Sequence, residues 1–177
     1  MKVKFLFVAT IVALFIASCG GVDKGLVDNI TKFEGEWTKM VTHVNGLADT
    51  MALSVAETTK ECDEVCSKEC TDKNMKGAMD TMKMKCTDAK AGMNTTIANI
   101  TDYKAKLKTM TDEFAAWKTK VMSGEIKMEE ATKALDEYKS KLADAQDQIV
   151  AFQTNFNSSK DECTSACGEQ KECCEKK

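Results

Sequence analysis

Cysteine is the residue type with the most chemistry to offer in this chain of 177 residues. One cysteine, Cys19, lies near the N-terminus, and the other eight form two groups that are far apart in the sequence. Several neighbours recur every four residues, a spacing that places them on one face of a helix. No CxxC or CxxCH motif occurs, which argues against a thioredoxin-type redox site and against covalently bound haem. The eight disulfide candidates are Cys62, Cys66, Cys70, Cys86, Cys163, Cys167, Cys173 and Cys174.

Two kinds of chemistry fit these cysteines. An even number of cysteines favours disulfides if the chain is exported to an oxidising compartment. The alternative is a soft-metal site, because thiolate and thioether sulfurs select Cu(I) and several methionines flank Cys86. The CxxxC spacing is similar to that of the copper-storage helix bundles, in ligand type and spacing only. The candidate ligands of this alternative are Cys62, Cys66, Cys86, Cys163, Cys167, Met79 and Met82.

Other catalytic and binding chemistry is poorly represented. His43 is the single histidine, so a histidine metal site or a histidine-based triad cannot form within one chain. All 25 basic residues are lysine and the formal net charge is −3, whereas nucleic-acid binding typically uses arginine and positive charge. No glycine-rich phosphate loop, nucleophile elbow or paired-carboxylate motif is present. We therefore expect no enzyme activity, no cofactor and no nucleic-acid partner.

The N-terminal segment is typical of an export signal. Lys2 and Lys4 precede an apolar stretch, residues 5–17, that is too short to span a membrane but suits a signal peptide. The sequence Ile16-Ala17-Ser18-Cys19 then resembles the lipobox of bacterial lipoproteins. This resemblance implies cleavage before Cys19 and acylation of Cys19 with palmitate-type chains, which would anchor the protein in a lipid bilayer. An ordinary cleaved signal, with Cys19 in a disulfide, is the alternative.

The lipoprotein resemblance also bears on localisation and on domain organisation. Enterobacterial lipoproteins with Asp directly after the acylated cysteine stay in the inner membrane, and this chain has Gly20 at that position. The resemblance therefore favours the outer membrane, without a choice between its two faces. The predicted organisation is a signal peptide over residues 1–18, a short lipidated tether over 19–24 and one helical domain over 25–177.

Helical periodicity dominates the remaining chain, which contains no proline. Apolar residues recur at steps of three and four along three segments, in the pattern of coiled-coil-like helices. Polar residues 71–74 and the pair Ser123-Gly124 separate these segments and offer capping residues. A weaker polar interruption lies at 157–159, and Gly168 is expected to end the third helix. The sequence predicts helices over about 25–70, 74–122 and 127–167.

Three helices of similar length joined by short turns must run antiparallel to one another. We therefore predict an all-α fold, an elongated up-down-up three-helix bundle of about 65–70 Å at 1.5 Å per residue. A long hairpin or coiled coil completed by a second copy of the chain is the alternative. In the three-helix bundle, the end of the first helix, the start of the second and the end of the third meet at one pole. These segments carry all eight cysteines.

The predicted topology also orders the cysteines by their level along the bundle. The favoured scheme joins Cys62 to Cys163, Cys66 to Cys167, and Cys70 to Cys173 or Cys174, and it leaves Cys86 to bond with whichever of the last two remains. A staggered scheme instead joins Cys62 to Cys86, Cys66 to Cys163 and Cys70 to Cys167, and it leaves Cys173 and Cys174 free to bond with another chain. Either scheme staples one end of the bundle.

The sequence thus predicts a noncatalytic, lipid-anchored protein of a bacterial cell envelope. Its helical rod, stapled by disulfides at one end, would act structurally or present its distal end or a long face to a protein partner. The residues do not identify that partner. The alternative is a Cu(I)-binding lipoprotein that uses the cysteine and methionine cluster.

Overall fold

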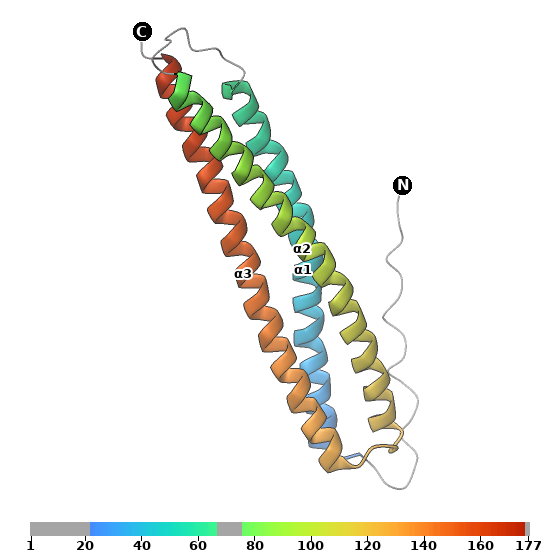
Figure 1. Cartoon of the computed structure of the whole chain (residues 1–177). Coiled ribbons are helices and arrows are strands. Elements are labelled where there is room, and N and C mark those ends of the chain that lie inside the picture. Colours follow the sequence, from blue (N-terminus) through green and yellow to red (C-terminus); the bar gives the residue numbers. More distant parts are fainter. Residues whose placement is uncertain (1–21, 67–75, 176–177) are drawn as a thin grey trace, which may run out of the picture.

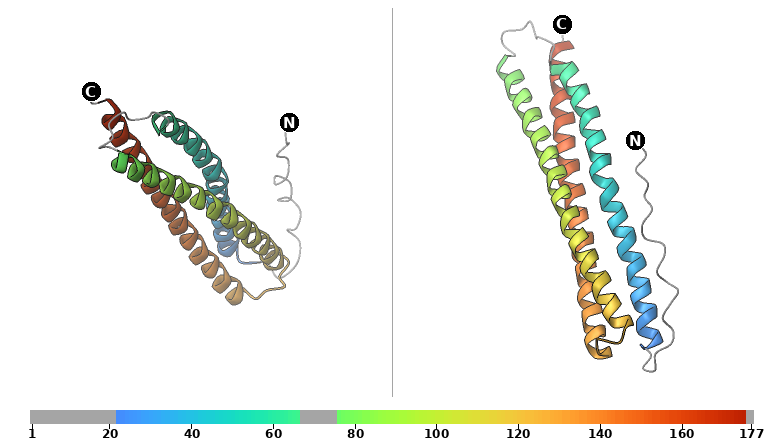
Figure 2. Two further views of the ribbon diagram at one scale, coloured as in Figure 1. Left: turned by 45° about the horizontal axis from the view of Figure 1, so that its top comes forward. Right: turned by 90° about the vertical axis from the view of Figure 1, so that its right-hand side faces the viewer.

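Three long helices account for most of residues 22–66 and 76–175, the part of the chain that the computed structural model describes (Figure 1). Helix α1 spans Lys24–Cys66, α2 spans Lys76–Met122 and α3 spans Met128–Glu175. The three helices lie along the length of one elongated bundle, and consecutive helices are antiparallel (Figures 1 and 2). The predicted all-α, up-down-up three-helix bundle is therefore confirmed, and a single chain completes it.

Capping groups are present at the start of α1 and at the end of α2. The backbone N–H of Leu26 donates to Oδ1 of Asp23 at 2.9 Å, so Asp23 caps the start of α1. At the end of α2, Gly124 adopts a φ of 76°, which favours glycine. Its N–H donates to the carbonyl of Val121, and the N–H of Glu125 donates to that of Lys120. These two bonds make a Schellman motif, with Gly124 at the C′ position that the sequence predicts.

The predicted apolar seams form the core of the bundle. In α1, every residue of the seam from Leu26 to Met51 is buried. The seams of α2 and α3 are buried over most of their length, with a few large side chains, such as Tyr103 and Trp117, half-buried at the edge of the core. Burial of these side chains supplies the main favourable free energy of folding. The fully or almost fully buried side chains include Ile30, Phe33, Val44, Met93, Ile100, Leu107, Val121 and Leu135.

An aromatic cluster reinforces the core in the half of the bundle that holds the start of α1. Phe33 of α1, Phe114 and Trp117 of α2 and Tyr138 of α3 stack with ring centroids 5.0–6.2 Å apart. All three helices therefore contribute to one set of tilted and edge-to-face contacts, which are worth about 0.5–1.5 kcal/mol per pair beyond their buried area. The cluster fixes the relative level of the three helices.

The third helix is longer than the sequence predicts. The expected end at Gly168 and the expected interruption at residues 157–159 are both wrong, because α3 is continuous to Glu175. Glycine within a helix costs only about 1 kcal/mol of propensity. Phe156 and Cys163, before and after the polar triplet, are buried on the same seam, and Ala166 and Cys167 are buried directly before Gly168. Tertiary packing therefore outweighs these local helix-breaking signals.

Gly92 marks a close approach between α2 and α3. A Cβ atom at this position would lie 2.6 Å from Oγ of Ser159 and 3.4 Å from its Cβ. The hydrogen of glycine is thus what lets the two helices come together here. Gly46 of α1 differs, because a Cβ placed there would meet nothing within 4 Å.

Alanine substitutions at these two glycines should have unequal effects. We expect Gly46→Ala to raise the free energy of unfolding by about 0.5–1 kcal/mol through helix propensity. Gly92→Ala should give little or no gain, since the new methyl group displaces the Ser159 hydroxyl. Adding Ser159→Ala to Gly92→Ala should recover most of the gain. Urea unfolding of the wild type and these three variants measures this, and equal effects of the two glycine substitutions would show that α2 and α3 are not in close contact at Gly92.

Candidate functional site

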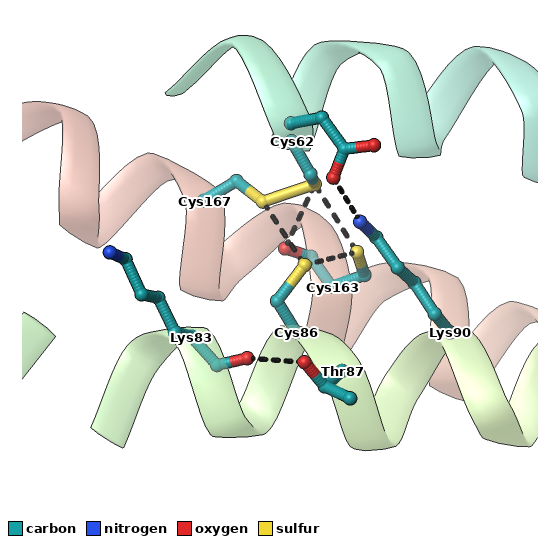
Figure 3. Close-up of polar contacts among 8 residues, drawn as sticks. Cys62, Lys83, Cys86, Thr87, Lys90, Cys163 and Cys167 are labelled. Carbon is teal, nitrogen blue, oxygen red and sulfur yellow. Dashed lines mark hydrogen bonds and ion pairs between the residues drawn. A yellow bond between two sulfur atoms is a disulfide. The ribbon is translucent and has the colours of Figure 1, made fainter. Parts of the chain in front are cut away.

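Four buried cysteines from all three helices meet near the pole where α1 and α3 end and α2 begins. We call Cys62 of α1, Cys86 of α2, and Cys163 and Cys167 of α3 the cysteine quartet. All four side chains are less than 10% exposed. Their sulfur atoms all lie within 4.8 Å of one another (Figure 3). The sequence-based expectation that cysteines gather at this pole is confirmed for these four residues.

The sulfur atoms of the quartet form a closed ring of contacts. Cys62 and Cys167 are joined by a disulfide, with their Cα atoms 5.5 Å apart. Cys163 and Cys86 are thiols in the structure. The Sγ atom of Cys163 lies 3.2 Å from that of Cys62 and 3.1 Å from that of Cys86. The Sγ atom of Cys86 lies 3.6 Å from that of Cys167, which closes the ring (Figure 3).

The disulfide differs from both predicted pairing schemes. Cys62 is bonded to Cys167, so its predicted bonds to Cys163 or to Cys86 are wrong, as are the predicted bonds of Cys167 to Cys66 or to Cys70. Cys163 and Cys167 lie one helical turn apart on the same face of α3, and Cys62 approaches both sulfurs. The positions of the turns in the sequence predict the height of each cysteine along the bundle only to within about one helical turn. They therefore cannot decide whether Cys62 bonds to Cys163 or to Cys167.

The other predicted disulfide partners are not part of what can be described at this site. Cys66, Cys173 and Cys174 lie in the terminal turns of α1 and α3, but their side chains are outside the described part of the structure. Cys70 lies in segment 67–75, which is also outside the described residues. Cys163 and Cys86 are thiols in the structure, so the predicted bonds of Cys66 with Cys163 and of Cys86 with Cys173 or Cys174 are wrong there. The predicted bond of Cys70 with Cys173 or Cys174 stays a prediction.

Burial dominates the electrostatics of the quartet. It raises the pKa of the Cys86 thiol from 9.0 to about 11, and the hydrogen bond and charge of Cys163 act in the same direction. Lys90, one turn further along α2, opposes this rise. At neutral pH only about one in ten thousand Cys86 side chains would be a thiolate. Cys86 is therefore a poor nucleophile, and it becomes a good metal ligand only if metal binding displaces its proton.

An ion pair lies beside the quartet and links α1 to α2. The ammonium group of Lys90 donates to Oδ1 of Asp63 at 2.6 Å (Figure 3). Burial lowers the pKa of Lys90, but the hydrogen bond to Asp63 and the negative charges around it outweigh burial and leave this pKa raised. Lys90 therefore stays protonated, and its charge is already paired with a carboxylate.

The methionines proposed as soft-metal ligands are not part of the group of four cysteines that could hold a metal. Met79 is buried two turns before Cys86 on α2, and Met82 is half-buried. Met84, which lies off the apolar seam, is 60% exposed. The burial of Met79 fits its place on the seam of α2, where methionine fills the core. Of the candidate cysteine ligands that the sequence offers, the group that the structure brings together consists of the four cysteine sulfurs of the quartet.

The N-terminal motif stays a prediction, because residues 1–21, including Cys19, lie outside the described part of the structure. Among the described residues, none of the helices is both long and apolar enough to cross a membrane. No known protein family, curated protein or solved structure matches this chain. The functional argument therefore rests on the bundle, the cysteine quartet and the N-terminal motif.

The raised pKa of Cys86 should make the stability of the reduced protein depend on pH. The folded state holds this thiol neutral, whereas in the unfolded chain it ionises near pH 9.0. Its contribution to stability is therefore complete below pH 9 and is lost as the pH rises through about 11. We expect the difference in unfolding free energy between reduced wild type and reduced Cys86→Ala to fall over this range. Urea unfolding at several pH values measures it.

Two features keep that comparison specific. Burial also raises the pKa values of Tyr103 and Tyr138, but both tyrosines are present in both proteins and their effects cancel in the difference. Thr87→Ala, at the exposed neighbour of Cys86, provides the matched control. The difference in unfolding free energy between the wild type and this variant should not change with pH. A Cys86→Ala difference that stays constant up to pH 11 would mean that the folded chain does not shield this thiol.

Proposed function

We propose that this protein is a noncatalytic, lipid-anchored component of a bacterial cell envelope that acts as a rigid helical rod. The observation that carries the proposal is the lipobox-like sequence Ile16-Ala17-Ser18-Cys19, followed after a few residues by the first turn of α1 at Lys24. A chain acylated at Cys19 would hold the start of α1 close to a bilayer. The outer membrane is the proposed location, because Gly20 follows the cysteine.

The geometry of the bundle supports the view of a rod with two different ends. Cys62 lies 38 residues after Lys24 on α1, a rise of about 57 Å along an ideal helix. The start of α1 and the cysteine quartet therefore lie towards opposite poles (Figures 1 and 2). With the anchor at one pole, the other pole and the long faces would be available to a protein partner.

The groove between α1 and α2 is consistent with a structural role. An open groove between α1 and α2 is lined by side chains that include Val41, Asn45, Lys104 and Thr111. In this groove, Lys104 donates to the backbone carbonyl of Asn45 at 3.3 Å. These side chains hold no nucleophile with an adjacent general base, which acyl or phosphoryl transfer would require.

Removal of the acylation site should release the protein from the membrane. We expect the protein expressed from its full-length gene to fractionate with membranes and to carry acyl chains on Cys19, since two or three chains give stable attachment. Cys19→Ala should shift the protein to the soluble fraction, and Cys86→Ala, as the matched cysteine control, should stay with the membranes. Fractionation with intact mass measures both, and a Cys19 without acyl chains in the wild type would refute the anchor.

A thiophilic metal centre is the second candidate function, and the quartet is the observation that favours it. A tetrahedral Zn²⁺ with Zn–S bonds of about 2.3 Å needs its sulfurs about 3.8 Å apart. The sulfur separations of the quartet, from 3.1 Å up to 4.8 Å in the unbonded pairs, bracket that value. Four thiolates around Zn²⁺ carry less net charge than four thiolates around Cu(I), and buried charge is costly. These four ligands therefore suit Zn²⁺ better than the Cu(I) that the sequence suggests.

Metal binding at the quartet requires free thiols and can be tested directly. If this candidate is right, the protein isolated without reductant should carry about one metal ion per chain, with four thiols that react only after a chelator is added. Cys86→Ser should lose the metal, and Met79→Leu should keep it, since thiolates alone would be the ligands. Elemental analysis with thiol counting measures this, and a quartet that contains no thiols and no metal would eliminate the candidate.

A further inference from the structure

We propose that Cys86 and Cys163 form a second disulfide, so that the quartet holds two bonds and α3 is joined covalently to both α1 and α2. The inference rests on the proposed function, because an exported chain meets the oxidising conditions in which disulfides form and persist. It goes further by assigning a modification site and a partner to each buried cysteine. The two disulfides are Cys62–Cys167 and Cys86–Cys163.

The first argument is one of distance and elimination. Cys167 is already bonded to Cys62, which leaves Cys86 and Cys163 as the two thiols of the quartet. Their sulfurs lie 3.1 Å apart. A disulfide bond is about 2.05 Å long, so closure requires a movement of about 1 Å, which small rotations of two side chains supply.

The second argument concerns which helices the bonds can join. Cys62 has its bonded partner and its 3.2 Å contact on α3, and Cys86 has its 3.1 Å and 3.6 Å contacts on α3. Exchange of partners between Cys163 and Cys167 would therefore still tie α1 and α2 to α3. The spacing of these two cysteines by one turn makes α3 the common partner in either arrangement.

The third argument is chemical. Two neutral thiols buried in an apolar core satisfy each other only by a weak S–H···S hydrogen bond. Oxidation removes both hydrogens and replaces this contact with an apolar, uncharged bond that suits the surroundings. The reaction balances with an external disulfide-bearing oxidant: the two thiols form one S–S bond, and the oxidant's disulfide is reduced to two thiols.

The sequence of the chain makes the proposed bond readable by peptide mapping. Trypsin cleaves after lysine, and the segment 86–90 between two cleavage sites contains Cys86 as its single cysteine. The segment 161–171 contains both Cys163 and Cys167, and the segment 61–68 contains Cys62 and Cys66. A chain with Ser at positions 66, 70, 173 and 174 therefore leaves only the quartet cysteines in these three segments.

The experiment starts from the full-length protein purified from membranes, with free thiols blocked by N-ethylmaleimide in denaturant. In the wild type, we expect segment 86–90 to be unlabelled before reduction and to appear only after reduction. In the four-serine variant, we expect the tryptic peptides 61–68, 86–90 and 161–171 to be joined by disulfides into one species. Adding Cys163→Ser should leave the bond between 61–68 and 161–171 and should convert Cys86 to a labelled thiol. Adding Thr164→Ser, the matched control, should leave the joined species intact.

Two results would overturn the inference. One is quantitative labelling of Cys86 in the unreduced wild type, which shows directly that it has no bond and does not depend on the folding of any variant. The other is a bond between segment 86–90 and any segment other than 161–171. The acyl chains on Cys19 are read from the same protein by mass. A missing lipid would refute the proposed function, whereas an acylated protein with a free Cys86 would refute only the second disulfide.

Discussion

The apolar seam that runs along all three helices is the constraint on which the rest of the structure depends. The helices contain 43, 47 and 48 residues, so at 1.5 Å per residue they are of nearly equal length. Each seam repeats at steps of three and four, and each can be buried along its full length only if the helices lie side by side. Their ends then coincide at both poles. The meeting of Cys62, Cys86 and Cys163 is a consequence of this length match, and no local motif is needed to explain it.

Much of this arrangement can be predicted from the residues, and the exceptions have physical causes. The α1 seam from Leu26 to Met51, the capping role of Gly124 and the pole at which cysteines gather all follow from periodicity and turn chemistry. The end of α3 does not follow from the sequence in this way, because glycine and serine disfavour a helix only by amounts that burial of the seam can offset. The disulfide partner of Cys62 cannot be predicted from the sequence either, because the choice between Cys163 and Cys167 depends on side-chain positions within one helical turn.

The environment of the quartet favours oxidised sulfur over ionised sulfur. Burial keeps the Cys86 thiol neutral, and Lys90, whose charge opposes this effect, already forms an ion pair with Asp63. A thiolate centre would therefore need a bound metal to compensate its charge, whereas a disulfide carries no charge and costs nothing to bury. The same burial that hinders ionisation protects a formed disulfide, because an attacking thiolate must reach it through the packed core.

The two ends of the bundle are stabilised by different means, and the proposed anchor gives a reason for this. The aromatic cluster of Phe33, Phe114 and Tyr138 locks the three helices about 14 Å from the start of α1, at the end that a lipid on Cys19 would hold near the membrane. The opposite pole lies far from the proposed anchor, and helix ends far from any restraint open most readily. Core packing at that pole uses small sulfur-bearing side chains in place of large rings, so apolar contact alone is weaker there. A covalent link between α1 and α3 compensates for it, because cross-linking distant residues restricts the unfolded chain and is independent of the size of the side chains around it.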